Sequence, residues 1–163
     1  MMLDERITYV VVAAILAVGG LTAVPPIIPE RVVEPFSELG VLGPKMKLGD
    51  YPSEVAVSEA FDLFLYVGNH EGRVVYYRTL IKVGDLETNV SDTEPFDAGV
   101  IDSVDLVLLD ERNMTVPLRL SLSEVGVNRR VVFELYKYDS GEKRFVYSGE
   151  WLQMWLNVTS SGI

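Results

Sequence analysis

The stretch RVVYYRTLIKV, residues 73–83, is rich in β-branched and aromatic side chains and predicts a β-strand. In the stretch before it, Phe61, Leu63, Leu65 and Val67 occupy every second position. Because successive side chains of a strand point to opposite faces, this alternation predicts another strand with a buried face. The turn-like sequence GNHEG at 68–72 separates the two segments.

The same strand pattern recurs along the rest of the chain between turn-like separators. Strands are expected at 104–109, 115–122, 129–138 and 150–158, with shorter ones at 39–42 and 145–147. Pro117 has no backbone N–H, so we expect its strand at a sheet edge or starting near it. About seven or eight strands predict a mainly β fold, an immunoglobulin-like antiparallel β-sandwich, with a small barrel as the alternative.

Composition excludes several classes of function. Lys and Arg number 14 against 24 Asp and Glu, a formal charge of -10, which would repel the phosphates of nucleic acid. With no cysteine and one histidine, the chain lacks disulfides, thiolate nucleophiles and the usual zinc ligands. We therefore expect no nucleic acid partner and no cofactor.

The N-terminal region predicts a membrane anchor. Residues 7–24 carry no charged side chain, and as a helix they would extend roughly 27 Å, close to the thickness of a bilayer core. The leader MMLDER lacks the net positive charge of a signal peptide, so a cleaved signal is the weaker alternative. We expect a single transmembrane helix within 1–28, a proline-rich spacer at 29–36 and the sandwich at 37–163. Small residues suited to helix packing are Ala13, Ala17, Gly19, Gly20 and Ala23.

Glycosylation acceptors suggest on which side of the membrane the sandwich lies. Asn89, Asn113 and Asn157 each open an Asn-x-Ser/Thr triplet. Three such triplets favour an extracytoplasmic domain on a single-pass membrane protein, although accidental triplets on a cytoplasmic domain are the alternative.

The one histidine, His70, is the obvious candidate for acid–base chemistry. A histidine base needs a nucleophile, and the sequence offers neither cysteine nor a Gly-x-Ser-x-Gly elbow. Asn69, His70 and Glu71 are instead interpreted as a hairpin turn, with Gly72 supplying a positive φ. The tip of this hairpin is a candidate for partner contact or pH sensing, and we expect no catalytic residue.

Two further groups of residues have both a functional and a structural interpretation. Asp92, Glu94 and Asp97 are weak candidates for calcium ligands, since their stretch lacks the spacing of an EF-hand and is better interpreted as a solvated acidic loop. Trp151 and Trp155 share one face of an expected strand, where core packing is favoured over an exposed face that binds glycans or protein.

Several short pieces resemble one family. They are FSELGVLGP at 36–44, Tyr51-Pro52, YVGNHEGRVVYY at 66–77, RRVVFELYK at 129–137 and WLQMWLNV at 151–158. Together they resemble an archaeal family known only as a domain of unknown function, number 1616. The resemblance implies a membrane-associated, extracytoplasmic β-sandwich and brings no activity or cofactor. Longer members look to carry several membrane helices, whereas one is expected here.

These features favour a non-enzymatic accessory or scaffold subunit of a membrane or cell-envelope complex. One alternative is a subunit of an extracellular filament or surface layer that self-assembles through the apolar N-terminal helix. The leader MMLDER lacks the basic residue and glycine of a prepilin-type cleavage site, which weakens this alternative. A glycan-binding envelope protein is the other alternative.

Overall fold

Eight strands account for every regular element in residues 34–160, the part of the chain that the computed structural model describes. The strands are β1 (Phe36–Leu42), β2 (Glu54–Ala56), β3 (Ala60–His70), β4 (Val75–Gly84), β5 (Gly99–Leu108), β6 (Arg112–Ser121), β7 (Gly126–Asp139) and β8 (Arg144–Thr159). The expected mainly β fold is confirmed. The compact unit that they form begins at Glu34.

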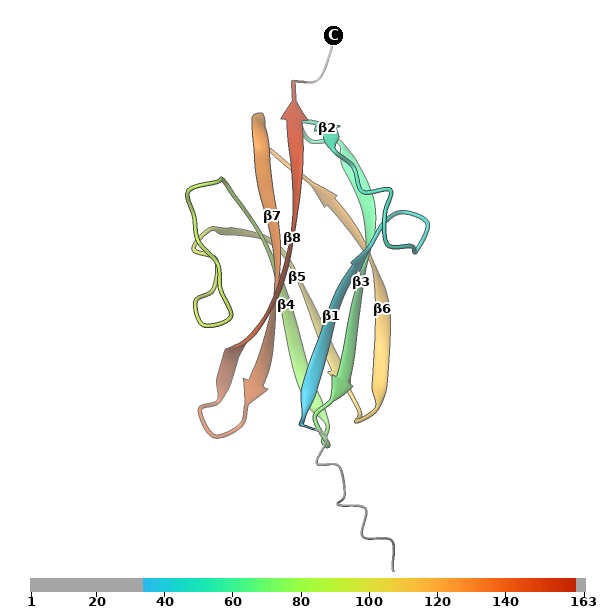
Figure 1. Ribbon diagram of the computed structural model, residues 1–163, viewed down its shortest axis with the longest axis vertical. Coiled ribbons are helices and arrows are strands. Elements are labelled where there is room, and N and C mark those ends of the chain that lie inside the picture. The colour runs from blue at the N-terminus through green and yellow to red at the C-terminus, as the bar shows by residue number, and fades with distance from the viewer. Residues whose placement is uncertain (1–33, 161–163) are drawn as a thin grey trace, which may run out of the picture. The chain divides into compact units, whose positions relative to one another are not determined.

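The strands form two sheets that face each other (Figure 1). The three-stranded sheet has the order β1-β3-β6, and the five-stranded sheet has the order β2-β8-β7-β4-β5. Neighbours are antiparallel, except that β2 pairs with β8 in parallel. This arrangement is a sandwich, so the barrel alternative was wrong. Pro117 lies on β6, which is an edge strand as expected.

The core lies between the sheets and follows the period of two seen in the sequence. Leu63, Leu65 and Val67 of β3 are fully buried, as are Tyr77 and Ile81 of β4. From β7 and β8 the core receives Val131, Phe133, Leu135, Leu156 and Val158. Each strand therefore presents one apolar face to the opposing sheet.

The expected hairpin at Asn69–Glu71 was wrong, because β3 and β4 belong to different sheets. β3 pairs with β1 along one edge and with β6 along the other, so it has no free edge for β4. The short connection after His70 therefore crosses from one sheet to the other. Gly72 does adopt the expected positive φ, 69°.

Two other details differ from the expected strands. The segments at 145–147 and 150–158 are one strand, β8, interrupted by a shift in its register with β7. Gly149 lies at the interruption with a φ of 89°, in the region that favours glycine. The short strand β2 was not expected from the sequence.

The expected transmembrane helix at 1–28 lies outside the described residues, as do its packing residues Ala13, Ala17, Gly19, Gly20 and Ala23. Residues 34–160 contain no helix long and apolar enough to cross a membrane. β1 starts at Phe36, the last residue of the expected spacer.

A long connection between β4 and β5, residues 85–98, packs on the outer face of the five-stranded sheet (Figure 1). Its Phe96 is fully buried, and the backbone N–H and C=O of Phe96 bond to Glu134 and Lys82. Trp151 and Trp155 lie on this outer face, where the guanidinium of Arg130 stacks on both rings. The expectation that the two tryptophans pack in the core between the sheets was therefore wrong.

Candidate functional site

The pairing of β1 with β3 brings together two of the stretches singled out in the sequence, FSELG and YVGNH. Phe36 pairs with His70, Glu38 with Gly68 and Gly40 with Tyr66. A Cβ on Gly68 would overlap the Glu38 carboxylate and lie 3.1 Å from the Cβ of Glu38. Gly68 therefore leaves the space that the Glu38 side chain occupies, and Tyr66 donates to Oε2 of Glu38 at 2.6 Å.

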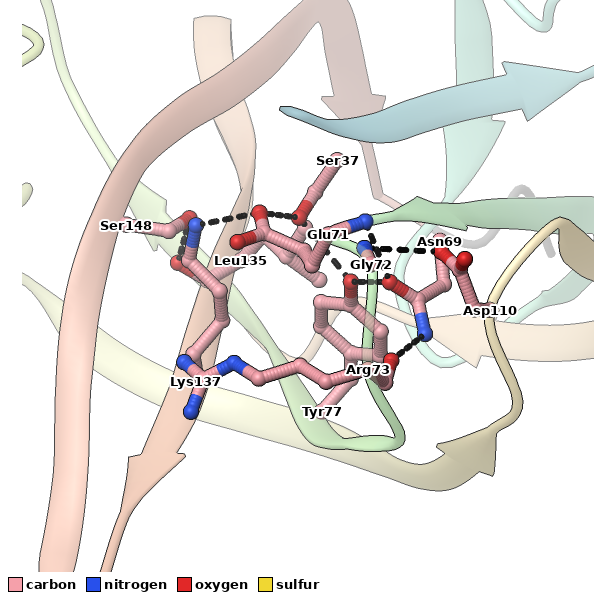
Figure 2. Close-up of polar contacts among 10 residues, drawn as sticks. All are labelled: Ser37, Asn69, Glu71, Gly72, Arg73, Tyr77, Asp110, Leu135, Lys137 and Ser148. Atoms are coloured by element: carbon pink, nitrogen blue, oxygen red, sulfur yellow. Dashed lines mark hydrogen bonds and ion pairs between the residues drawn. The ribbon is translucent and has the colours of Figure 1, made fainter. Parts of the chain in front are cut away.

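Asn69 fixes the connection between the two sheets (Figure 2). Its side chain is fully buried, and Nδ2 donates to the carbonyl oxygens of Arg73 at 2.8 Å and Leu108 at 2.9 Å. Oδ1 accepts from the backbone N–H of Glu71 at 3.0 Å and from the hydroxyl of Tyr77 at 3.2 Å. Every bonding position of the amide is used, so Asn69 is a structural residue.

Glu71 continues this network toward the five-stranded sheet (Figure 2). Its Oε1 accepts from Oγ of Ser37 at 2.7 Å and from Nζ of Lys137 at 2.9 Å. Burial raises the pKa of Glu71, but the two donors outweigh it and hold the pKa below its usual range. The hydroxyl oxygens of Ser37 and Tyr77 lie 2.9 Å apart, so a row of three polar contacts, which share two hydroxyl protons, runs from Glu71 to Asn69 between the sheets.

His70 lies between two carboxylates. Its Nδ1 is 3.1 Å from Oε2 of Glu111, and its Nε2 is 3.6 Å from Oε2 of Glu38. The ring stacks on Phe36 with a centroid distance of 4.6 Å. Both nitrogens and one face of the His70 ring are therefore in contact with neighbouring side chains of the described chain.

The predicted interaction residues are therefore not presented together at an exposed tip. Asn69 is buried, and the side chain of Glu71 is only 11% exposed, whereas that of His70 is 25% exposed. The reason is that the connection crosses between sheets, which turns these side chains toward the strands around them.

A groove lies beside this network, between β1 and β8. Its larger hollow, of about 620 Å³, is lined by Ser37, Glu38, Leu39, Tyr66, Gly149, Glu150, Trp151 and Leu152. A second hollow of about 270 Å³ shares Leu39 and Leu152 with the first and is otherwise lined by Gly40, Val41, Leu48, Tyr51, Gln153 and Met154. The groove thus has a polar end with two carboxylates and a mainly apolar end.

The acidic candidates for calcium lie on the connection at 85–98. Asp92, Glu94 and Asp97 are all exposed. Residues 34–160 contain no group of three or more His, Asp or Glu side chains arranged to hold a metal ion. The structure therefore does not assemble these three carboxylates into a ligand set.

The glycosylation candidates lie on three different elements. Asn89 and Asn113 are exposed, while Asn157 is partly buried. Oδ1 of Asn157 accepts a hydrogen bond from the backbone N–H of Asn128 at 2.9 Å. Glycosylation at these sites stays a prediction, and its first two acceptors are open to solvent.

Sequence reasoning missed several residues of the network and groove. Ser37 and Glu38 lie in the FSELG piece, whose sequence carries the family resemblance but no motif of a polar network. Lys137 and Glu150 lie on the expected strands at 129–138 and 150–158, where nothing in the local sequence distinguishes them from surface charges. The sequence did contain one signal for this contact. A glycine in a strand can indicate that a bulky side chain of the neighbouring strand lies opposite it, as the two glycines of β1 and β3 show.

Comparison with known proteins gives one family and one fold. The model of the family described as Domain of unknown function (DUF1616) matches residues 29–157, as the sequence resemblance implied. No curated protein matches the chain. The CARDB domain of the PF1109 protein from Pyrococcus furiosus, solved in complex with di-metal ions, is similar at 11% identity over 78% of this chain and 96% of that domain, with a TM-score of 0.50.

Two further solved structures match with TM-scores below 0.5. A β-glucosidase from Listeria innocua is 10% identical, with a TM-score of 0.48, and the match covers 79% of this chain but 17% of the enzyme. Spo0M, a sporulation control protein from Bacillus subtilis, is 9% identical over 77% of this chain and 50% of its own, with a TM-score of 0.45. At such identities the likeness to the CARDB domain concerns the fold alone.

Proposed function

This chain belongs to the DUF1616 family, and from that premise we propose that it is a non-enzymatic accessory or scaffold subunit of a membrane or cell-envelope complex. In this proposal the stretch 1–28 is a single transmembrane helix, and the immunoglobulin-like sandwich lies outside the cytoplasm. The charge-free run at 7–24 and the three glycosylation triplets support this placement.

One observation carries the proposal. Asn69 and Glu71, which flank the one histidine of the chain, are bonded into the network that joins the two sheets. His70 contacts two carboxylates and an aromatic ring. Side chains that stabilise the fold in this way are suited to holding a rigid surface in place, which is what a scaffold requires.

The proposal is tested by purifying the full-length protein from its native membrane in a mild detergent. A stable complex with another membrane or envelope protein is expected, identified by mass spectrometry. A lone monomer under these conditions would contradict the proposal. Filaments in electron micrographs of the same material would instead favour the surface-polymer alternative.

A further inference from the structure

One side of the sandwich has two strand edges that the described chain leaves unpaired. β1 has β3 as its only partner. β2 covers the edge of β8 only opposite 157–159, so β8 pairs only with β7 over 144–156. Every second residue of a free edge directs its backbone N–H and C=O away from the sheet, where another strand can bind them.

The groove described above runs along these two edges. Leu39 on β1 and Leu152 on β8 line both hollows, which makes them one continuous site. At the apolar end Leu48 is 83% exposed, beside Tyr51, which is 40% exposed. An apolar side chain from a partner would find a matching surface at this end.

The polar end of the groove favours a positively charged group instead of an apolar one. Glu38 and Glu150 bring two carboxylates to it, in a chain with a formal charge of -10. Oε2 of Glu150 is buried and has no hydrogen-bond partner in the described residues. A buried carboxylate oxygen without a donor is unfavourable, so this end of the groove favours a ligand that brings a positive charge and N–H groups.

We propose that this groove binds an extended segment of a partner protein, which adds to the five-stranded sheet as a strand beside β8, in line with β2. The segment places an apolar side chain against Leu48 and a lysine or arginine at Glu38 and Glu150. This inference rests on the proposed scaffold function and specifies the chemistry of the partner.

The structure also predicts the spacing in the bound segment. Glu150 and Met154, at the two ends of the groove, are separated by four positions, which is about 13 Å along a strand. Side chains on one face of a strand recur at every second residue. The basic and apolar side chains of the partner are therefore expected four residues apart.

A peptide selection tests the proposal on the full-length protein in detergent. Random peptides displayed on phage are selected against the immobilised chain, and the enriched sequences are synthesised and titrated. We expect a basic and an apolar residue at the stated spacing. Hydrogen exchange should show that amides at 150–156 become protected when the peptide binds.

Matched variants distinguish binding in the groove from a general attraction of basic peptides to the acidic chain. Leu48→Lys should weaken binding at least tenfold, and Glu150→Gln at least fivefold. The controls Leu86→Lys and Glu94→Gln make the same changes at exposed positions on the connection at 85–98, and they should bind within about twofold of the unaltered chain.

Failure to enrich any peptide, equal binding by groove and control variants, or binding without protection of 150–156 would each overturn the inference. Selective binding of neutral glycans in the groove would overturn it as well. The scaffold function is tested separately: a complex that co-purifies unchanged with Leu48→Lys would refute the groove while leaving the scaffold intact.

Discussion

Replacing Lys82 by methionine is expected to destabilise the sandwich by about 3–5 kcal/mol, because it leaves a buried carboxylate without its counter-charge. Glu134 is fully buried, and Nζ of Lys82 lies 2.9 Å from its Oε2. The same Nζ donates to the carbonyl of Phe96 at 2.7 Å. In the variant, Glu134 retains the N–H of Phe96 and the hydroxyl of Tyr136, which is 3.1 Å away.

The assay is thermal unfolding followed by circular dichroism. For a domain of this size, 1 kcal/mol corresponds to roughly 4 °C, so Tm should fall by about 12–20 °C. The control is Lys45→Met, since Lys45 pairs with Asp50 at the surface, where the two side chains are 75% and 66% exposed. It should change the free energy of unfolding by no more than about 0.5 kcal/mol.

A double variant makes the physical cause testable. Lys82→Met with Glu134→Leu removes both charges, so it should be less destabilised than the sum of the two single variants. The remaining loss would come from the N–H and C=O of Phe96, which lose their partners. A loss below about 1 kcal/mol for Lys82→Met alone, or additive single effects, would refute the reasoning.

Three further predictions concern the network and the surface. Gly68→Ala should cost about 1–3 kcal/mol in urea unfolding, since the added methyl meets Glu38, whereas Gly99→Ala meets open space and should cost less than about 1. Glu71, whose folded pKa is lowered, contributes stability above its ordinary value of 4.5 that is lost as pH falls through the folded pKa. Urea unfolding of Glu71→Gln should accordingly show a deficit at pH 7 that shrinks below about pH 4.5, and a constant deficit would contradict the assignment. Mass spectrometry of the native protein should find a glycan on the exposed Asn113 that is lost in Asn113→Gln, and an unmodified asparagine would count against an extracytoplasmic location.

The sequence predicted most strands because side-chain alternation is a local property. At 61–67 of β3 and 131–135 of β7 every second residue is apolar and faces the core, so the alternation can be recognised in the amino-acid order. Which strands pair with each other cannot be predicted in the same way, because a short turn can connect two strands of one hairpin or two strands of different sheets. The outcome at Asn69 depended on β1 and β6 occupying both edges of β3, which no local pattern reveals.

The two tryptophans show a second limit of prediction from the sequence. Reasoning from alternation assumes that a strand has one buried face, and on that basis Trp151 and Trp155 were expected in the core. The connection at 85–98 gives the five-stranded sheet a second covered face, with Phe96 fully buried beneath it. An aromatic face on a strand therefore does not indicate which side of the sheet it occupies.

The way that connection is held also bears on where a partner binds. Its acidic residues suggested a solvated loop or a calcium site, yet its backbone accepts hydrogen bonds from Arg130 and Tyr147 at Thr88 and Ser91, and Lys82 holds it at Phe96. If the connection moved away from the sheet, Phe96 and the ion pair of Lys82 with Glu134 would become exposed to water. The outer face of the five-stranded sheet is therefore occupied by the chain's own connection, whereas no strand of the described chain pairs with the outer edge of β1 or with the edge of β8 over 144–156. A partner that docks without first unfolding part of the sandwich is accordingly expected at those edges.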